Sequence, residues 1–304
     1  MSSLPARGEA VRSLGMPVPP ARMPLVRDRR LLKRWKYVGF YSSELMLCAA
    51  EAHVGPLGQR FWGVALPDGR LLAGRALVGS GGVSLSAGRL RLRARADGRA
   101  ERAGGQHGGG SGAGGGGEPV EVDLTLDEAG GPPAVESVSG AGARGYVWTR
   151  KLAGMRARGH VLVDGRRRVL DGEAVIDDTA GYHPRHTLWR WSAGVGRGAG
   201  GERIGWNLVE GVNDDPQGSE RTLWVDGRPV EVGPVHFSDD LGRIAFVDGG
   251  ELRFEPWATL AHRTRLGLVR SDYRQPFGQF SGELPGGLRL TEGHGVAERH
   301  EAWW

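Results

Sequence analysis

Residues 61–78 read FWGVALPDGRLLAGRALV, which is two apolar runs separated by Asp68-Gly69. Both central residues of a type I′ turn adopt positive φ, which Asp and Gly tolerate, so this pattern predicts a β-hairpin. The same dipeptide recurs at residues 97–98, 164–165, 171–172, 226–227 and 248–249. Hairpin signals at this spacing predict many short antiparallel strands and argue against alternating strands and helices.

Period-two patterns support the same interpretation. In residues 120–126 the apolar side chains alternate with Glu121, Asp123 and Thr125, as in a half-buried strand. Helix signals are weak: residues 27–36 and 255–266 each fit either a short helix or part of a strand. We therefore predict an all-β protein made of two antiparallel barrel-like or sandwich halves with few short helices.

The 304 residues include 53 glycines without a three-residue period, which excludes collagen. Ten of the fourteen residues 104–117 are glycine, and this segment is expected to form a flexible, disordered insertion. We expect a basic, proline-rich segment at 1–30, extended or poorly ordered as far as Pro24, because it lacks regular apolar periodicity. A first β half is then expected at 31–143 and a second at 144–304.

The net charge of +5 is unevenly placed, with +10 in the first 118 residues and −5 in the remainder. Nearly all the cations are arginine, and the three lysines are Lys33, Lys36 and Lys151. A GC-rich genome produces the same excess of arginine, glycine and alanine. Because no nucleic-acid-binding motif accompanies the charge, no nucleic-acid partner is predicted.

The chain shows no secretory signal and no apolar run near the ~20 residues of a membrane helix, so a cytoplasmic location is expected. Its single cysteine, Cys48, lies in an apolar stretch. A buried, inert thiol is the favoured interpretation, and a catalytic thiol is the alternative.

A dense cluster of polar and aromatic residues occupies 177–191. A strand beginning at Arg185 would place Arg185, Trp189 and Trp191 on one face. These side chains would either line a pocket, with Arg185 holding a polar end of the ligand, or form core, with Arg185 paired to a nearby aspartate. A metal site at His183 and His186 is not favoured, because their spacing diverges on a strand and Pro184 opposes a helix.

The last strand contains a second candidate cluster. In residues 292–300, Glu292, His294, Val296, Glu298 and His300 share one face of a strand. A Glu and His pair of this kind can hold a proton near neutral pH, as a general acid must. The alternative is an outward-facing polar surface.

Residues 204–213 alternate as well, placing Asn207 opposite Trp206. A buried Asn207 needs hydrogen-bond partners from the backbone or from a ligand. No nucleophile elbow, phosphate loop, dinucleotide fingerprint or zinc motif is present in the sequence. Neither a cofactor nor a metal is therefore predicted.

Four segments, at 33–41, 177–191, 206–211 and 270–278, resemble a bacterial family known only as a domain of unknown function. The resemblance extends from Arg30 to the C-terminus, and the glycine-rich insertion departs from it. That family is distantly similar to lipocalin-like proteins, among them the carotenoid hydratase hydroxyneurosporene synthase and AttH-like proteins, and more distantly to tocopherol cyclases. The resemblance implies two barrel-like halves, a ligand cavity in or between them, and apolar substrates handled without a cofactor.

Three hypotheses follow. In the first, a hydrophobic isoprenoid- or lipid-like molecule is bound and then protonated, hydrated, isomerised or cyclised. The acid would be Glu298 or His300, with Asp178 as a further candidate. The ligand would be held by Arg185, Trp189, Trp191, Trp206, Asn207 and His294. In the second, the protein is a non-catalytic carrier or sensor of the same ligand. In the third, the arginine-rich N-terminal segment makes a weak contact with an anionic membrane.

Overall fold

The computed structural model describes residues 4–77, 79–97, 117–142, 145–266 and 269–304. In these residues the chain forms two large antiparallel sheets, one two-stranded sheet and two short 3₁₀ helices, η1 (Gly8–Leu14) and η2 (Pro285–Gly287). The prediction of an all-β fold with few short helices is confirmed. Neither described helix is long and apolar enough to cross a membrane.

The first sheet has the strand order β7-β6-β5-β4-β13-β12-β10-β9-β8, and β11 pairs with both β12 and β1. Its strands are β1 (Ala6–Arg7), β4 (Lys33–Tyr41), β5 (Met46–Val54), β6 (Leu57–Ala65), β7 (Leu71–Ala76), β8 (Val83–Ser86), β9 (Arg89–Arg95), β10 (Pro119–Leu126), β11 (Val135–Gly140), β12 (Tyr146–Val163) and β13 (Arg166–Gly181). A separate hairpin joins β2 (Val26–Arg27) to β3 (Arg30–Leu31).

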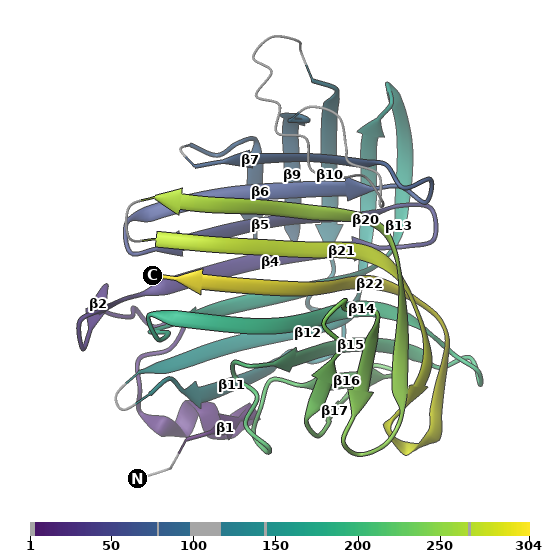
Figure 1. Ribbon diagram of the computed structural model, residues 1–304. Coiled ribbons are helices and arrows are strands. Elements are labelled where there is room, and N and C mark those ends of the chain that lie inside the picture. Colours follow the sequence, from purple (N-terminus) through teal and green to yellow (C-terminus); the bar gives the residue numbers. More distant parts are fainter. Residues whose placement is uncertain (1–3, 78, 98–116, 143–144, 267–268) are drawn as a thin grey trace.

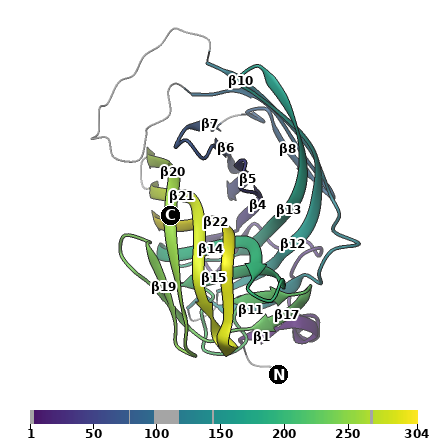
Figure 2. The same cartoon turned by 90° about the vertical axis from the view of Figure 1, so that its right-hand side faces the viewer.

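The second sheet has the order β17-β16-β15-β14-β22-β21-β20-β19-β18. Its strands are β14 (His186–Gly198), β15 (Arg203–Glu210), β16 (Thr222–Val225), β17 (Arg228–Glu231), β18 (Val235–Phe237), β19 (Arg243–Phe246), β20 (Glu251–Leu266), β21 (Val269–Leu284) and β22 (Leu288–Trp303). Both sheets curl into half-barrels, as Figures 1 and 2 show.

Each curled sheet buries one face in a core of its own and packs the other face against its partner sheet. On β4, Val38 and Phe40 enter the core of the first sheet, whereas Tyr37 and Tyr41 turn toward the second sheet. Strand alternation produces this division, because successive side chains point to opposite faces. The second sheet repeats it, and the two sheets meet in a shared core that includes Trp191 and Phe277.

Four of the predicted Asp-Gly turns lie at hairpins. In the turns at 164–165 and 226–227 both residues have positive φ, and Gly69 and Gly249 also have positive φ. The prediction at 171–172 is wrong, because these residues lie inside strand β13. There Gly172 leaves room for the ring of Phe40, whose atoms would lie 3.0 Å from an added Cβ. Gly98 lies outside the described residues.

Both helix candidates are strands. Residues 33–36 belong to β4, and residues 255–266 belong to β20, which pairs with β21 along most of its length. Tertiary pairing therefore decides between the two states that the local pattern left open.

The expectation of a poorly ordered N-terminal segment is wrong. Val11, Val18 and Met23 are buried in a core with Trp148 and Tyr182. The hydroxyl of Tyr182 donates to the backbone carbonyl of Pro24 at 2.7 Å. Because the apolar residues of this segment are irregularly spaced, their docking on aromatic side chains gives no periodic signal.

Sheet membership changes at residues 182–185, between β13 and β14. The chain therefore passes from the first sheet to the second later than the predicted domain boundary at 143/144. The reason is that β12 and β13 pair with strands of the first sheet. The division into domains at 31–143 and 144–304 stays a prediction. Of the expected insertion at 104–117, residues 104–116 lie outside the described residues.

Cys48 is buried in the shared core, and burial raises the pKa of its thiol to about 12. Because the thiolate is the reactive form, we expect a thiol reagent to modify Cys48 only after unfolding. Labelling with a maleimide, followed by intact mass, should give no adduct in buffer and one adduct in denaturant. Rapid labelling of the native protein would instead support the alternative of a reactive thiol.

Candidate functional site

A cavity of about 90 Å³ lies between the two sheets. Its aromatic wall includes Trp35, Phe61, Trp189, Trp191 and Tyr273. Its polar residues are Lys36, Gln59, Lys151, Asp177, Thr179, His183, Asn213, Glu220, His262, Glu298 and His300. Because both sheets contribute, the cavity exists only when the two half-barrels pack together.

Glu298, on β22, is the carboxylic acid at the aromatic side of the cavity. Its Oε1 accepts a hydrogen bond from Trp189 Nε1 at 2.9 Å, and its Oε2 accepts one from Gln275 Nε2 at 3.1 Å. The side chain is almost fully buried. Burial raises the pKa of Glu298 to about 7, although the hydrogen bond from Trp189 acts in the opposite direction. This carboxyl group therefore changes protonation state near neutral pH.

His300 lies two residues after Glu298 and on the same face of β22. Its Nε2 is 2.8 Å from the Oγ of Ser271, and its ring centroid is 4.3 Å from that of Trp189. Burial, with a smaller contribution from His262, lowers the pKa of His300 to about 3. His300 is therefore neutral at pH 7 and has no proton of imidazolium type to donate.

The cavity lining also contains a largely buried ionic cluster. Lys151 Nζ lies 2.5 Å from Asp177 Oδ1 and 3.2 Å from Glu220 Oε1. Burial opposes the charge on Lys151, but the two carboxylates outweigh it and raise its pKa. Burial also raises the pKa of Glu220, against the effect of Lys151. The cluster therefore holds Lys151 in its charged form, while burial works against ionisation of Glu220.

Two buried polar atoms of cavity residues, the hydroxyl of Tyr273 and Nδ1 of His183, make no hydrogen bond of good geometry within the described residues. Both residues still have polar neighbours in the protein. Tyr273 lowers the pKa of Glu298, and the backbone of Gly181 opposes the fall in the pKa of His183.

The structure brings four of the sequence-derived site residues together around the cavity: Glu298, His300, Trp189 and Trp191. Asn207 lies beside them, since its Oδ1 accepts a hydrogen bond from Trp191 Nε1 at 2.8 Å. Its Nδ2 donates to the backbone carbonyl of Glu220 at 3.0 Å, so both of its partners come from the protein. The even-numbered face of β22 points inward at Val296, Glu298 and His300.

The remaining four lie elsewhere. Asp178 faces a separate pocket on the other side of β13, with Lys36 and Glu51, because it is one residue out of phase with Asp177. Arg185 is exposed and precedes β14. Trp206 packs in the core of the second sheet, where its Nε1 donates to Ser192 Oγ. His294 is buried beside Trp257 and does not line the cavity.

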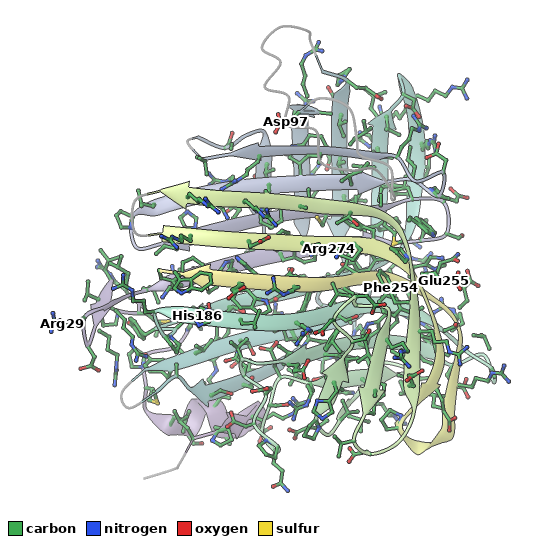
Figure 3. The ribbon with its side chains drawn as sticks, viewed as in Figure 1. Arg29, Asp97, His186, Phe254, Glu255 and Arg274 are labelled. Atoms are coloured by element: carbon green, nitrogen blue, oxygen red, sulfur yellow. The ribbon has the colours of Figure 1, made fainter. Side chains whose placement is uncertain are left out.

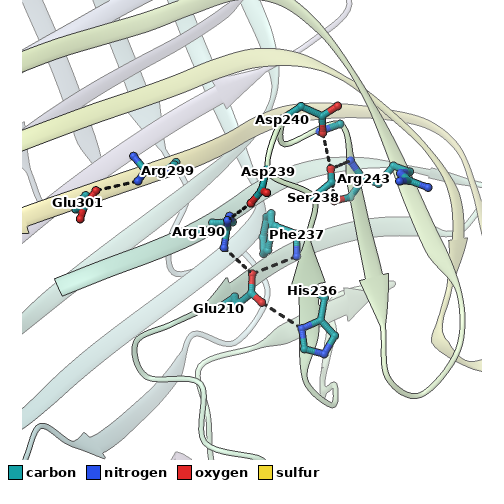
Figure 4. Close-up of polar contacts among 11 residues, drawn as sticks. Arg190, Glu210, His236, Phe237, Ser238, Asp239, Asp240, Arg243, Arg299 and Glu301 are labelled. Carbon is teal, nitrogen blue, oxygen red and sulfur yellow. Dashed lines mark hydrogen bonds and ion pairs between the residues drawn. The ribbon is translucent and has the colours of Figure 1, made fainter.

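Side chains of β14 alternate between the cavity and the outer face of the second sheet. Arg190, between the two cavity tryptophans, turns away and pairs with Glu210 and Asp239 (Figure 4). Glu210 also binds His236 Nδ1 at 3.1 Å and the backbone amide of Phe237. These ion pairs lie on the surface side of the sheet and take no part in the cavity.

Sequence reasoning missed Lys151, Asp177, Glu220 and Tyr273. A usable signal was the choice of cation: in a chain that otherwise uses arginine, Lys151 lines the cavity, and Lys36 lines both the cavity and the separate pocket of Asp178. The third lysine, Lys33, donates to the carbonyl of His183 at 3.3 Å. The choice between Asp177 and Asp178 had no such signal, because both preceding residues, Val175 and Ile176, are buried.

Comparisons with solved structures give an AttH-like protein from Nitrosomonas europaea, with 14% identity and a TM-score of 0.51 over 93% of this chain and 97% of that chain. Kievitone hydratase from Nectria haematococca gives 10% identity and a TM-score of 0.46 over 88% of each chain. CghA gives 10% identity and a TM-score of 0.41 over 90% of this chain and 88% of that chain. The likeness to the AttH-like protein shows a shared fold.

The curated proteins include no significant match to this chain. One family model matches residues 18–304, which is nearly the whole sequence. It describes a domain of unknown function, which is the kind of family that the four sequence segments predicted. The chain therefore belongs to the DUF2804 family.

Proposed function

We propose that this protein binds a small hydrophobic molecule between its two half-barrels and transfers a proton to it from Glu298. The observation that carries the proposal is an almost fully buried carboxyl group with a pKa of about 7, held against an aromatic wall by Trp189. A general acid works best when its pKa lies near the working pH.

The chemistry needs no group beyond the side chains and water. The proton leaves Glu298 and forms a C–H bond with one carbon of a double bond, and the neighbouring carbon becomes a cation. Trp189 and Trp191 would stabilise that charge through their ring faces. Addition of water and return of one proton to the carboxylate would complete hydration. Attack by a second double bond, or loss of a different proton, would give cyclisation or isomerisation. The carboxylate that Glu298 becomes in the first step is the candidate acceptor for that proton.

The size of the cavity restricts how a ligand can enter. A volume of about 90 Å³ is smaller than the roughly 300–1,000 Å³ of most small-molecule sites. An isoprenoid-sized ligand therefore needs the lining to move. Val212 and Asn213 belong to the segment between β15 and β16, outside any strand, and this segment is the part of the wall best able to do so.

Mass spectrometry of apolar molecules that co-purify with the protein should identify the ligand, and incubation should then reveal a product. We expect Glu298→Gln to retain binding and to lower turnover by about 100-fold or more. Wild-type turnover should fall as the pH rises through about 7, because only protonated Glu298 can act as an acid. Asp178→Asn, which changes a carboxyl group on the other side of β13, should retain wild-type turnover.

Equal turnover by wild-type protein and Glu298→Gln would overturn the proton transfer. Saturable quenching of tryptophan fluorescence by the ligand, without product in any variant, would identify a carrier instead.

A further inference from the structure

We propose that one edge of the molecule docks onto an anionic lipid bilayer. This apolar edge is formed by strand ends and turns from both sheets. It presents Leu25, Val26, Leu31, Leu57, Leu77, Leu188 and Trp303, which are seven of the ten large hydrophobic side chains exposed in the described residues. Leu57 is 69% exposed and Leu25 and Val26 are each 53% exposed, so these side chains face solvent and not a core. Scattered apolar residues are ordinary on a surface, but a gathered set marks an interaction site.

Strand register places these residues together in the first sheet. Lys33, at the start of β4, pairs with Val54 at the end of β5, and Val54 pairs with Leu57 at the start of β6. The β2–β3 hairpin joins the same edge, because the backbone amide of Leu32 bonds to Leu25 and that of Gly55 bonds to Leu32. Leu77 follows the last residue of β7, whose partner strand is β6.

The second sheet adds its strand ends at the same place. His186, the first residue of β14, pairs with Trp303, near the end of β22, and their rings stack at 4.4 Å. The two sheets touch here, since Lys33 Nζ lies 5.1 Å from the ring of Trp304 and Trp35 lies 5.7 Å from the same ring. Figure 3 shows Arg29, on the β2–β3 hairpin, at the left-hand margin of the molecule.

Arginines surround the apolar edge. Six of them are exposed and have no ion-pair partner within the part of the chain that the structure describes: Arg22, Arg29, Arg34, Arg185, Arg265 and Arg270. The acids nearby are largely engaged, since Glu301 pairs with Arg299 and His186, and Asp272 pairs with Arg263. In an anionic bilayer, the apolar side chains would enter the boundary of the acyl chains, and the surrounding arginines would contact the anionic head groups.

The same charges argue against a second copy as the partner. Two such edges brought together would place unpaired arginines from both copies against one another, which is unfavourable. An exposed tryptophan at the margin also suits the interfacial layer of a bilayer, where tryptophan rings concentrate. The N-terminal segment packs on the fold, and its exposed Arg22 and Arg29 belong to the apolar edge and its surrounding arginines. Neither sheet forms this surface alone.

The docking surface is independent of the proton chemistry proposed for Glu298, although the cavity residues Trp35 and His183 lie close behind this edge.

Flotation with vesicles tests the proposal. We expect the full chain to float with phosphatidylcholine vesicles that contain about 30 mol% phosphatidylglycerol and not with pure phosphatidylcholine. Binding should weaken by about fivefold or more in Leu25→Ser/Leu57→Ser and in Arg29→Ser/Arg34→Ser, and in salt of about 0.5 M. The matched control is Val169→Ser/Arg166→Ser. It removes an 81% exposed valine and an exposed arginine at the far end of β13, and it should float like the wild type.

Unfolding midpoints of all variants show that the exposed substitutions leave the fold intact. Equal flotation with both vesicle types, no flotation, or equal loss in the control would overturn the proposal. If the wild-type protein does not float but forms a dimer, and Leu25→Ser/Leu57→Ser is monomeric, the edge is a self-association surface instead. Glu298→Gln should float normally, so that failure of the proton chemistry and failure of the docking surface remain distinguishable.

Discussion

Glu298→Gln is expected to be more stable than the wild-type protein at pH 8.5, by about 3 kcal/mol. Burial raises the pKa of Glu298 from its ordinary 4.5 to about 7 in the folded protein. One pKa unit corresponds to about 1.4 kcal/mol of difference between the two protonation states. The folded state therefore holds a proton that the unfolded chain has released between these pH values.

The sign follows from this difference. The stabilisation is fully present below pH 4.5 and is lost as the pH rises to about 7, after which the loss is constant. A glutamine at this position has no proton to lose, so the variant escapes that loss. A carboxyl group retained at such a cost indicates a role in function and not in stability.

Urea unfolding of both proteins at pH 5.5 and pH 8.5 measures the effect. His183 and His300, whose pKa values burial lowers to about 3, destabilise both proteins on acidification, so the difference between the proteins isolates Glu298. A difference in stability that does not change with pH would contradict the buried, protonatable state of this group.

The second large effect is expected at Lys151. Its side chain is 3% exposed and is the cation that Asp177 and Glu220 share. Lys151→Met leaves the buried Glu220 and the partly buried Asp177 without a counter-charge, and removing one partner of a buried ion pair costs about 3–5 kcal/mol. The loss should be smaller at low pH, because the remaining carboxyl groups then bind protons.

Two variants check that charge causes the loss. Neutralising the cluster with Lys151→Met/Asp177→Asn/Glu220→Gln should restore most of the stability, since no unpaired charge remains. Arg156→Met is the control on the same strand: Arg156 pairs with Asp171 at 3.0 Å, but both side chains are at least half exposed. Its effect should be below about 1 kcal/mol. Denaturant midpoints that fall equally for Arg156→Met and Lys151→Met would argue against a special role of the buried cluster.

The inward side of the site was largely predictable from strand periodicity. Glu298 and His300 share a face because they are two residues apart on one strand, and Trp189 and Trp191 share a face for the same reason. Periodicity does not say whether a face points to a core, to a neighbouring sheet or to water. Trp206 illustrates this limit: it lies on the opposite face of its strand from Asn207 and is buried in the core of the second sheet, away from the cavity.

The sequence alone determined the all-β class, most of the hairpins and the alternation within strands. These depend on turn dihedrals and on a two-residue period, which are local properties. Only the tertiary structure decided that the cavity lies between the half-barrels, that Asp177 and not Asp178 faces it, and that Lys151 meets Glu220 there. Those contacts join residues distant in sequence, and they arise from the packing of one sheet on another, for which a strand pattern carries no signal.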